Sequence, residues 1–184
     1  MKTIIVYYSN THNNEILAYY IQKKLSCDIL KIEEVRKRTG LTILMDLIFN
    51  RTPKLNQHSI SLELYSDIIF VAPIWASKIA SPLRAFLHKE KQNVKHYSFI
   101  SLCGGVKGQL ENIKKQLSEI LGCEPSAAKE LWISDILAMD KKNNIKYTSG
   151  YRVVPTDLEN FRQKIDEFLN GQLLQSNSKK YELQ

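Results

Sequence analysis

Uninterrupted apolar runs mark the strands that the sequence predicts most clearly. One run extends from Thr3 to Tyr8 and another from Ile68 to Ala72, and both are rich in β-branched and aromatic residues. A run without alternating polar positions is typical of a strand that is buried on both faces of a sheet. Residues 97–103 predict a third such strand. Residues 28–32 and 129–134 predict two shorter strands, the first at a sheet edge because a lysine interrupts its apolar pattern.

Apolar residues at helical spacing follow these strands, so the chain alternates between β and α patterns. A weaker helical pattern occupies part of residues 36–57. We expect the Ser81 hydroxyl to cap a helix whose first position is Pro82, and Gly122 to end the helix that follows the third strand. The segment from Thr156 to Glu159 predicts a capping box at the start of the last helix.

Five strands that alternate with helical patterns predict one α/β domain with a parallel sheet. The length of 184 residues fits a single domain, which we place at residues 1–171. Residues 172–184 form a polar tail for which we expect no fixed structure. Ligands of parallel sheets bind at the carboxyl ends of the strands, where the strand order reverses. The loops at 9–14, 73–81 and 103–108 are therefore the candidate site.

The first candidate loop reads Ser-Asn-Thr-His-Asn-Asn and opens a helix. Hydroxyls, side-chain amides and the free N–H groups of a first helical turn all donate to anions, so the loop suits a phosphate monoester. The same residue types also form ordinary helix caps, and composition alone does not separate the two interpretations. The glycines of a dinucleotide-binding loop and the Gly-Lys of a phosphate-binding P-loop are absent, which disfavours both. His12 is either an acid–base group or an exposed loop residue.

The other two loops offer a flat surface and a close backbone approach. Trp75 follows a buried strand, where its indole would either stack on a planar ring or fold back onto the core. Cys103 is followed by Gly104 and Gly105, whose backbone could approach a flat ligand closely, although glycine also suits a strand-to-helix turn. No C-x5-R phosphatase loop surrounds Cys103, so an inert core thiol is the preferred interpretation of that residue.

These segments carry a resemblance to a known family. Residues Tyr8 to Asn14 resemble the FMN phosphate loop that opens the flavodoxin family. Phe70 to Trp75 and Ser81 to Leu87 are similar to the strand, flavin loop and helix of the same superfamily, and Cys103 to Gly105 follow at a matching spacing. The resemblance covers roughly residues 2–170. It implies a flavodoxin-like three-layer sandwich, with a five-stranded parallel sheet of order 2-1-3-4-5, helices on both faces and non-covalently bound FMN.

The resemblance also implies roles for individual residues. The phosphate loop would comprise Ser9, Asn10, Thr11, His12, Asn13 and Asn14. The isoalloxazine would lie between Pro73, Ile74, Trp75 and Ala76 on one side and Cys103, Gly104, Gly105 and Gly108 on the other. Two positions depart from the family pattern, which usually has Gly in place of His12 and Thr in place of Asn14. A positive φ would strain the backbone at His12, although histidine tolerates it better than most residues.

The charge and the cysteine content limit the classes of partner, cofactor and cellular compartment that we expect. The 26 Lys and Arg against 19 Asp and Glu give a formal charge of +7. The cations are scattered, and no basic stripe alternates with aromatics, so we expect no nucleic-acid partner. The three cysteines form no C-x-x-C pair, which favours a reducing compartment and excludes a Cys-rich zinc site. The sequence shows no signal peptide and no apolar stretch of ~18 residues, so we expect a cytoplasmic protein without a membrane span. We also expect no bound metal.

Together these features favour an FMN-dependent oxidoreductase that passes electrons from NAD(P)H to a quinone or a similar acceptor. Two alternatives stay open. One is an electron shuttle that has no small-molecule substrate and docks on a redox partner protein, and the other is a flavin-free binding or sensing module. Typical electron carriers of the family are acidic, whereas this chain is basic, which favours the enzyme. The oligomeric state is not determined by the sequence.

Overall fold

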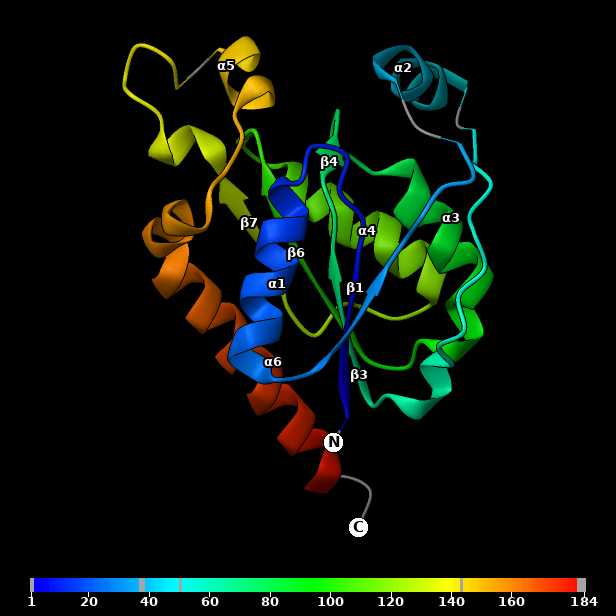
Figure 1. The fold of residues 1–184 in the computed structure, drawn as a ribbon. Helices are drawn as coiled ribbons and strands as arrows, with labels where there is room; N and C mark the ends of the chain where they lie inside the picture. Colours follow the sequence, from blue (N-terminus) through cyan, green and yellow to red (C-terminus); the bar gives the residue numbers. More distant parts are fainter. Residues whose placement is uncertain (1, 37–38, 50, 143, 182–184) are drawn as a thin grey trace.

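A five-stranded parallel sheet forms the centre of the molecule (Figure 1). The computed structural model describes residues 2–36, 39–49, 51–142 and 144–181, with the backbone alone at position 47 and beyond residue 171. The strand order is β2-β1-β3-β6-β7, which is 2-1-3-4-5 when the five sheet strands alone are counted, so the predicted topology is confirmed. The strands are β1 (Thr3–Tyr7), β2 (Asp28–Lys31), β3 (Asp67–Val71), β6 (Tyr97–Cys103) and β7 (Ala128–Trp132).

Both faces of this sheet are buried. Along β1, Ile4 and Val6 point into one apolar core, and Ile5 and Tyr7 point into the other. The first core is closed by α3 (Ser81–Glu90) and α4 (Gln109–Leu121), and the second by α1 (Asn13–Leu25) and α6 (Arg162–Tyr181). The chain therefore builds a three-layer sandwich, and the uninterrupted apolar runs of the sequence reflect burial on both sides.

The shorter elements complete the chain. A helix α2 (Gly40–Phe49) and a short helix α5 (Ile145–Gly150) lie at the end of the molecule where the sheet strands finish (Figure 1). A small antiparallel hairpin of β4 (Ile74–Trp75) and β5 (Lys78–Ile79) follows β3. In the part of the chain that the structure describes, 3-10 turns occur at Leu62–Leu64, Lys91–Asn93, Ile133–Ile136 and Pro155–Phe161. Within the described ranges, the helices are too short or too polar to cross a bilayer.

Three local predictions need correction. Ala80 is the N-cap of α3, and Ser81 lies inside the helix, where its hydroxyl donates to Asp46 at 2.9 Å. Before α6, the Asp157 carboxylate accepts from the backbone N–H of Val154, so the cap lies two residues earlier than predicted. Helix α6 also continues past Gly171 to Tyr181, because nothing in the polar sequence that follows breaks a helix. The last residues of the predicted tail, 182–184, lie outside the described part.

Two asparagines at the start of α1 fasten this helix to the rest of the fold. The side-chain amide of Asn14 donates to the Leu102 carbonyl and accepts from the Leu102 N–H, each at 2.9 Å. Asn13 does the same across residues 151–153, donating to the Tyr151 carbonyl and accepting from the Val153 N–H, each at 3.0 Å. Both side chains are buried. Each side-chain amide therefore pairs with a backbone N–H and a backbone carbonyl that would otherwise be buried without a hydrogen-bond partner.

Replacing Asn14 by alanine should destabilise the protein strongly, because the N–H and carbonyl of Leu102 would stay buried without partners. We expect Asn14→Ala to lower the free energy of unfolding by about 2–4 kcal/mol in urea titrations without added flavin. The exposed Asn56 provides the control, and Asn56→Ala should change stability by less than about 0.5 kcal/mol. Equal midpoints and slopes for both variants would contradict this role of Asn14.

Candidate functional site

The topology brings the three candidate loops to one edge of the sheet. Strands β1, β3 and β6 are neighbours, and the loops at 9–14, 73–81 and 103–108 follow their carboxyl ends. The strand order reverses at β1, which pairs with β2 on one side and with β3 on the other. This is the position at which open parallel sheets bind ligands.

The first loop ends at a helix start whose N-cap residue makes no side-chain capping hydrogen bond. His12 occupies the N-cap position of α1 and makes no side-chain cap hydrogen bond. The N–H groups of the first turn have no acceptor within the helix, and the helix dipole adds positive potential there. Ser9 contributes a second feature, because its hydroxyl oxygen is buried and has no hydrogen-bond partner in the described structure. An oxyanion seated at this loop would satisfy both the hydroxyl and the first-turn N–H groups.

The loop residues divide into an outward and an inward set. Asn10 and His12 are exposed, and Ser9 and Thr11 are half-buried. Asn13 and Asn14 point inward, and their amides are taken by the backbone of other segments. The donor amide that the sequence led us to expect from Asn14 therefore faces Leu102, and these two residues can offer an anion their backbone N–H groups. Their part in ligand binding stays a prediction.

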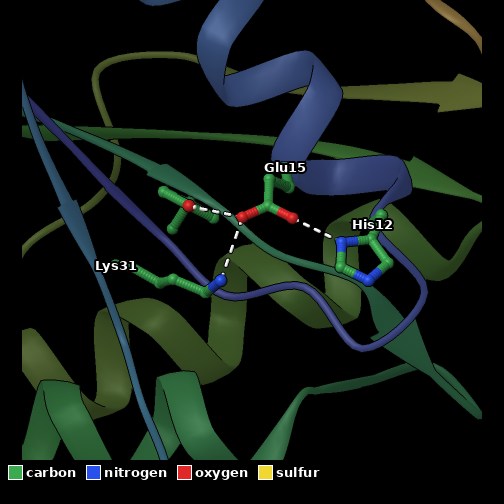
Figure 2. Close-up of polar contacts among 4 residues, drawn as sticks. His12, Glu15 and Lys31 are labelled. Carbon is green, nitrogen blue, oxygen red and sulfur yellow. Dashed lines mark hydrogen bonds and ion pairs between the residues drawn. The ribbon is translucent and has the colours of Figure 1, made fainter.

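His12 adopts the conformation that usually requires glycine. Its φ of 66° lies in the left-handed region, which is costly for a side chain with a β-carbon. A contact between the His12 ring nitrogen Nδ1 and Glu15 Oε2 fixes the side chain in this turn. Figure 2 shows Glu15 between His12 and Lys31, with its carboxylate reaching both.

Glu15 is the charged centre of this corner, and we did not predict its role from the sequence. Its Oε1 accepts from the Tyr7 hydroxyl at 2.8 Å and lies 3.0 Å from Lys31 Nζ. Burial by itself raises the pKa of Glu15, but hydrogen bonds from His12, Tyr7 and Lys31 outweigh burial and lower the pKa to about 2. The carboxylate next to the loop is therefore ionised and surrounded by donors. The available signal was its place in the first turn of α1, where a carboxylate interacts favourably with the helix dipole.

The second loop is a tight hairpin, not an irregular loop. Ala76 and Ser77 both have positive φ, at 48° and 58°, and join the short strands β4 and β5. Two amides of α4 hold the tip, since Asn112 donates to the Ser77 carbonyl at 2.9 Å and Gln116 donates to the same oxygen at 3.1 Å. The Gln116 side-chain oxygen also accepts from the N–H of Ile79. Helix α4 therefore sets the position of the hairpin.

Trp75 is half-buried in this hairpin. Its ring meets the Tyr8 ring edge to face, with 5.9 Å between centroids and an interplanar angle of 87°. The indole also packs against the core that lies under α3 and α4. Pro73 and Ile74 are half-buried beside it, and Ala76 forms the turn. The role of Trp75 as a stacking surface stays a prediction.

In the third loop, packing within the protein explains the central glycine. A β-carbon on Gly105, whose φ is +97°, would lie 2.4 Å from the Ser134 hydroxyl and 3.1 Å from Trp132. Cys103 is buried, and burial raises the pKa of its thiol to about 12, as expected for an inert thiol. Gly104 lies beside Thr148 of α5, and Gly108 is the N-cap of α4. Whether these residues also approach a ligand stays a prediction.

Solved structures with the same architecture support this description of the fold. A flavoprotein of Lactobacillus acidophilus in complex with FMN matches with a TM-score of 0.62 and 16% identity, over 70% of this chain and 92% of its own. A Bacteroides eggerthii protein described as a flavoprotein matches with a TM-score of 0.64 and 14% identity, over 71% of this chain and 87% of its own. The fold is flavodoxin-like. Neither a protein-family model nor a curated protein sequence matches the chain.

The flavodoxin-like fold also places at the candidate site a segment that we expected to be only a polar connection to the last helix. Residues 138–155 include α5, and this segment meets two of the candidate loops. Asn13 bonds to Tyr151 and Val153, and Thr148 lies against Gly104. The segment therefore contacts both the first and the third loop. Its composition is polar, so nothing in the residue pattern indicated a contact with the site.

The ionised Glu15 should make stability depend on pH in a defined direction. Because the folded pKa lies below the ordinary value, its contribution is complete above about pH 4.5 and disappears as the pH falls toward 2. We expect Glu15→Gln to cost on the order of 1–2 kcal/mol near pH 7 and far less near pH 2.5, since water screens part of the interaction. Urea titrations at both pH values measure this difference.

The matched control is Glu111→Gln, which alters an exposed carboxylate paired with Lys114 on α4. This variant should change stability little at either pH. If Glu15→Gln costs the same at both pH values, the carboxylate does not carry the contribution assigned to it.

Proposed function

We propose that the chain binds FMN non-covalently and is an FMN-dependent oxidoreductase that transfers electrons from NAD(P)H to a quinone or a similar acceptor. The observation that carries the first part is the buried, unpartnered hydroxyl of Ser9 beside the uncapped start of α1. These donors suit a phosphate monoester and have no evident use for a neutral ligand. The Lactobacillus acidophilus flavoprotein of the same fold, crystallised with FMN, supports the choice of flavin.

The residues of the loops take defined parts in this proposal. Ser9, Thr11 and the N–H groups of Asn13 and Asn14 hold the phosphate, with Asn10 and His12 on the open side of the loop. The ring lies between the hairpin, with Pro73, Ile74, Trp75 and Ala76, and the third loop, with Cys103, Gly104, Gly105 and Gly108. Glu15 does not oppose the phosphate strongly, because His12 and Lys31 face its carboxylate. Bound FMN supplies the redox chemistry, and the protein supplies binding, orientation and electrostatics.

The charge of the chain supports an enzyme over an electron shuttle. Shuttles associate with their partners through complementary surface fields, and the acidic carriers of this fold use negative charge for that purpose. Here the net charge is +7, and Lys78 in the hairpin and Lys107 in the third loop place cations at the proposed flavin edge. Cations at this edge favour the approach of the phosphates of NAD(P)H. The proposed location of the protein is the cytoplasm.

FMN should bind far more tightly than riboflavin, because the phosphate alone reaches Ser9 and the start of α1. Calorimetric titration of the flavin-free protein should give at least a roughly tenfold difference between the two ligands. Ser9→Ala should weaken the affinity for FMN about 5- to 30-fold and leave the affinity for riboflavin unchanged.

The control for this variant is Ser61→Ala, which removes an exposed hydroxyl that makes no cap hydrogen bond. Equal affinities for FMN and riboflavin would contradict the phosphate loop. Failure to bind either flavin would favour the alternative of a flavin-free module, which the inward-pointing amides of Asn13 and Asn14 also suit.

The enzyme should accept electrons from nicotinamides without a partner protein. Under anaerobic conditions, NADH or NADPH should bleach the visible flavin absorbance of the holoprotein faster than that of free FMN at the same concentration. A quinone added afterwards should restore the absorbance as it takes up two electrons and two protons. Bleaching by a chemical reductant, but by neither nicotinamide, would contradict the enzyme and favour the shuttle.

A further inference from the structure

Helix α2 presents an apolar face that the rest of the described chain leaves uncovered. Leu41, Leu44 and Ile48 are spaced three and four positions apart, so they lie on one face of the helix. Their exposed fractions are 69%, 52% and 62%, and the neighbouring Phe49 is 58% exposed. Surface helices normally turn such a stripe toward the core, and apolar patches of this kind mark contact sites. In Figure 1, α2 projects from the body at the end where the candidate loops lie.

The acidic groups beside this helix are engaged with the body of the protein. Asp46, the single charged residue of α2, accepts from the Ser81 hydroxyl at 2.9 Å. Glu34, which lines the same groove of about 490 Å³ as Asp46, accepts from the Tyr8 hydroxyl at 2.8 Å. Arg36 and Lys54 line the same groove, so cations lie beside both carboxylates on this side of α2.

Exposed cations precede and follow α2 along the chain. Arg36 precedes the helix, and Arg51 and Lys54 follow it, all three exposed. The Arg51 guanidinium lies 5.3 Å from the centre of the Phe49 ring, so positive charge and apolar surface meet at the end of α2. Apolar side chains bordered by Lys and Arg are the pattern of helices that bind anionic lipid, with the apolar groups among the acyl chains and the cations at the headgroups.

We propose that α2 docks the protein on the surface of an anionic phospholipid bilayer. Leu41, Leu44 and Ile48 enter the headgroup boundary, and Arg36, Arg51 and Lys54 contact lipid phosphates. A helix of ten residues is too short to span the bilayer, so it lies in the interface. A second copy of the chain fits less well, because a symmetric contact through α2 would bring its flanking cations near those of the partner. Bilayer docking does not depend on flavin binding.

Flotation of the full chain with lipid vesicles tests the proposal. Vesicles of phosphatidylcholine with ~30% phosphatidylglycerol should bind the protein, and pure phosphatidylcholine vesicles should bind it at least about tenfold more weakly. The double variant Leu44→Ser/Ile48→Ser should weaken binding to the anionic vesicles about tenfold or more. Its control is Leu64→Ser, which alters a side chain outside α2 that is 67% exposed, and this variant should bind as the unmodified chain does.

The cations are tested in the same assay. Arg51→Gln/Lys54→Gln should weaken vesicle binding more than Lys89→Gln/Lys91→Gln, which removes two exposed charges elsewhere. Circular dichroism and thermal unfolding verify that each variant is folded. The proposal is overturned if the anionic vesicles do not bind the chain, or if the Leu44/Ile48 variant binds them as well as the unmodified chain does. It is also overturned if the chain dimerises in solution and this variant is monomeric, since a second copy would then cover α2.

Discussion

Two buried asparagine amides hold the start of α1, and the geometry of the candidate site depends on them. Asn14 ties the helix to β6, and Asn13 ties it to the segment that carries α5. Each amide presents one donor and one acceptor to a backbone segment, and at Leu102 it does so beyond the last residue of β6 that pairs with β3. The first loop is thereby fixed relative to the third loop, and its uncapped N–H groups keep a defined direction.

The charge distribution around the first turn of α1 depends on the same helix start. A helix start attracts anions, but Glu15 in the first turn places a negative charge beside it. The contacts of this carboxylate with Tyr7, Lys31 and His12 are local, so its charge is largely compensated where it stands. The contact with His12 also helps to hold a left-handed residue where glycine would be the ordinary choice. The departure from the family pattern at His12 is thus coupled to an ionised group.

The sequence was sufficient to predict the sheet and the edge at which the three candidate loops meet, but not the contacts between these loops. Apolar runs predicted the central strands because burial on both faces leaves no polar positions, and the strand order then brought the three loops together. The hairpin after β3 was missed because Ala76 and Ser77 are not the residues that favour positive φ. The segment with α5 was missed because its contacts with the site, through Asn13 and Gly104, join positions far apart in the chain.

The way in which α4 holds the hairpin has a consequence for how this fold can be altered. The shape of the turn is imposed by Asn112 and Gln116 and not by its own residues. The hairpin is therefore not a portable unit, and grafting residues 73–79 onto another scaffold would discard the amides that maintain it. The smallest exchangeable piece is the hairpin together with α4. Within that piece, the two turn residues can vary during evolution while α4 maintains the position of the hairpin and of its Trp75.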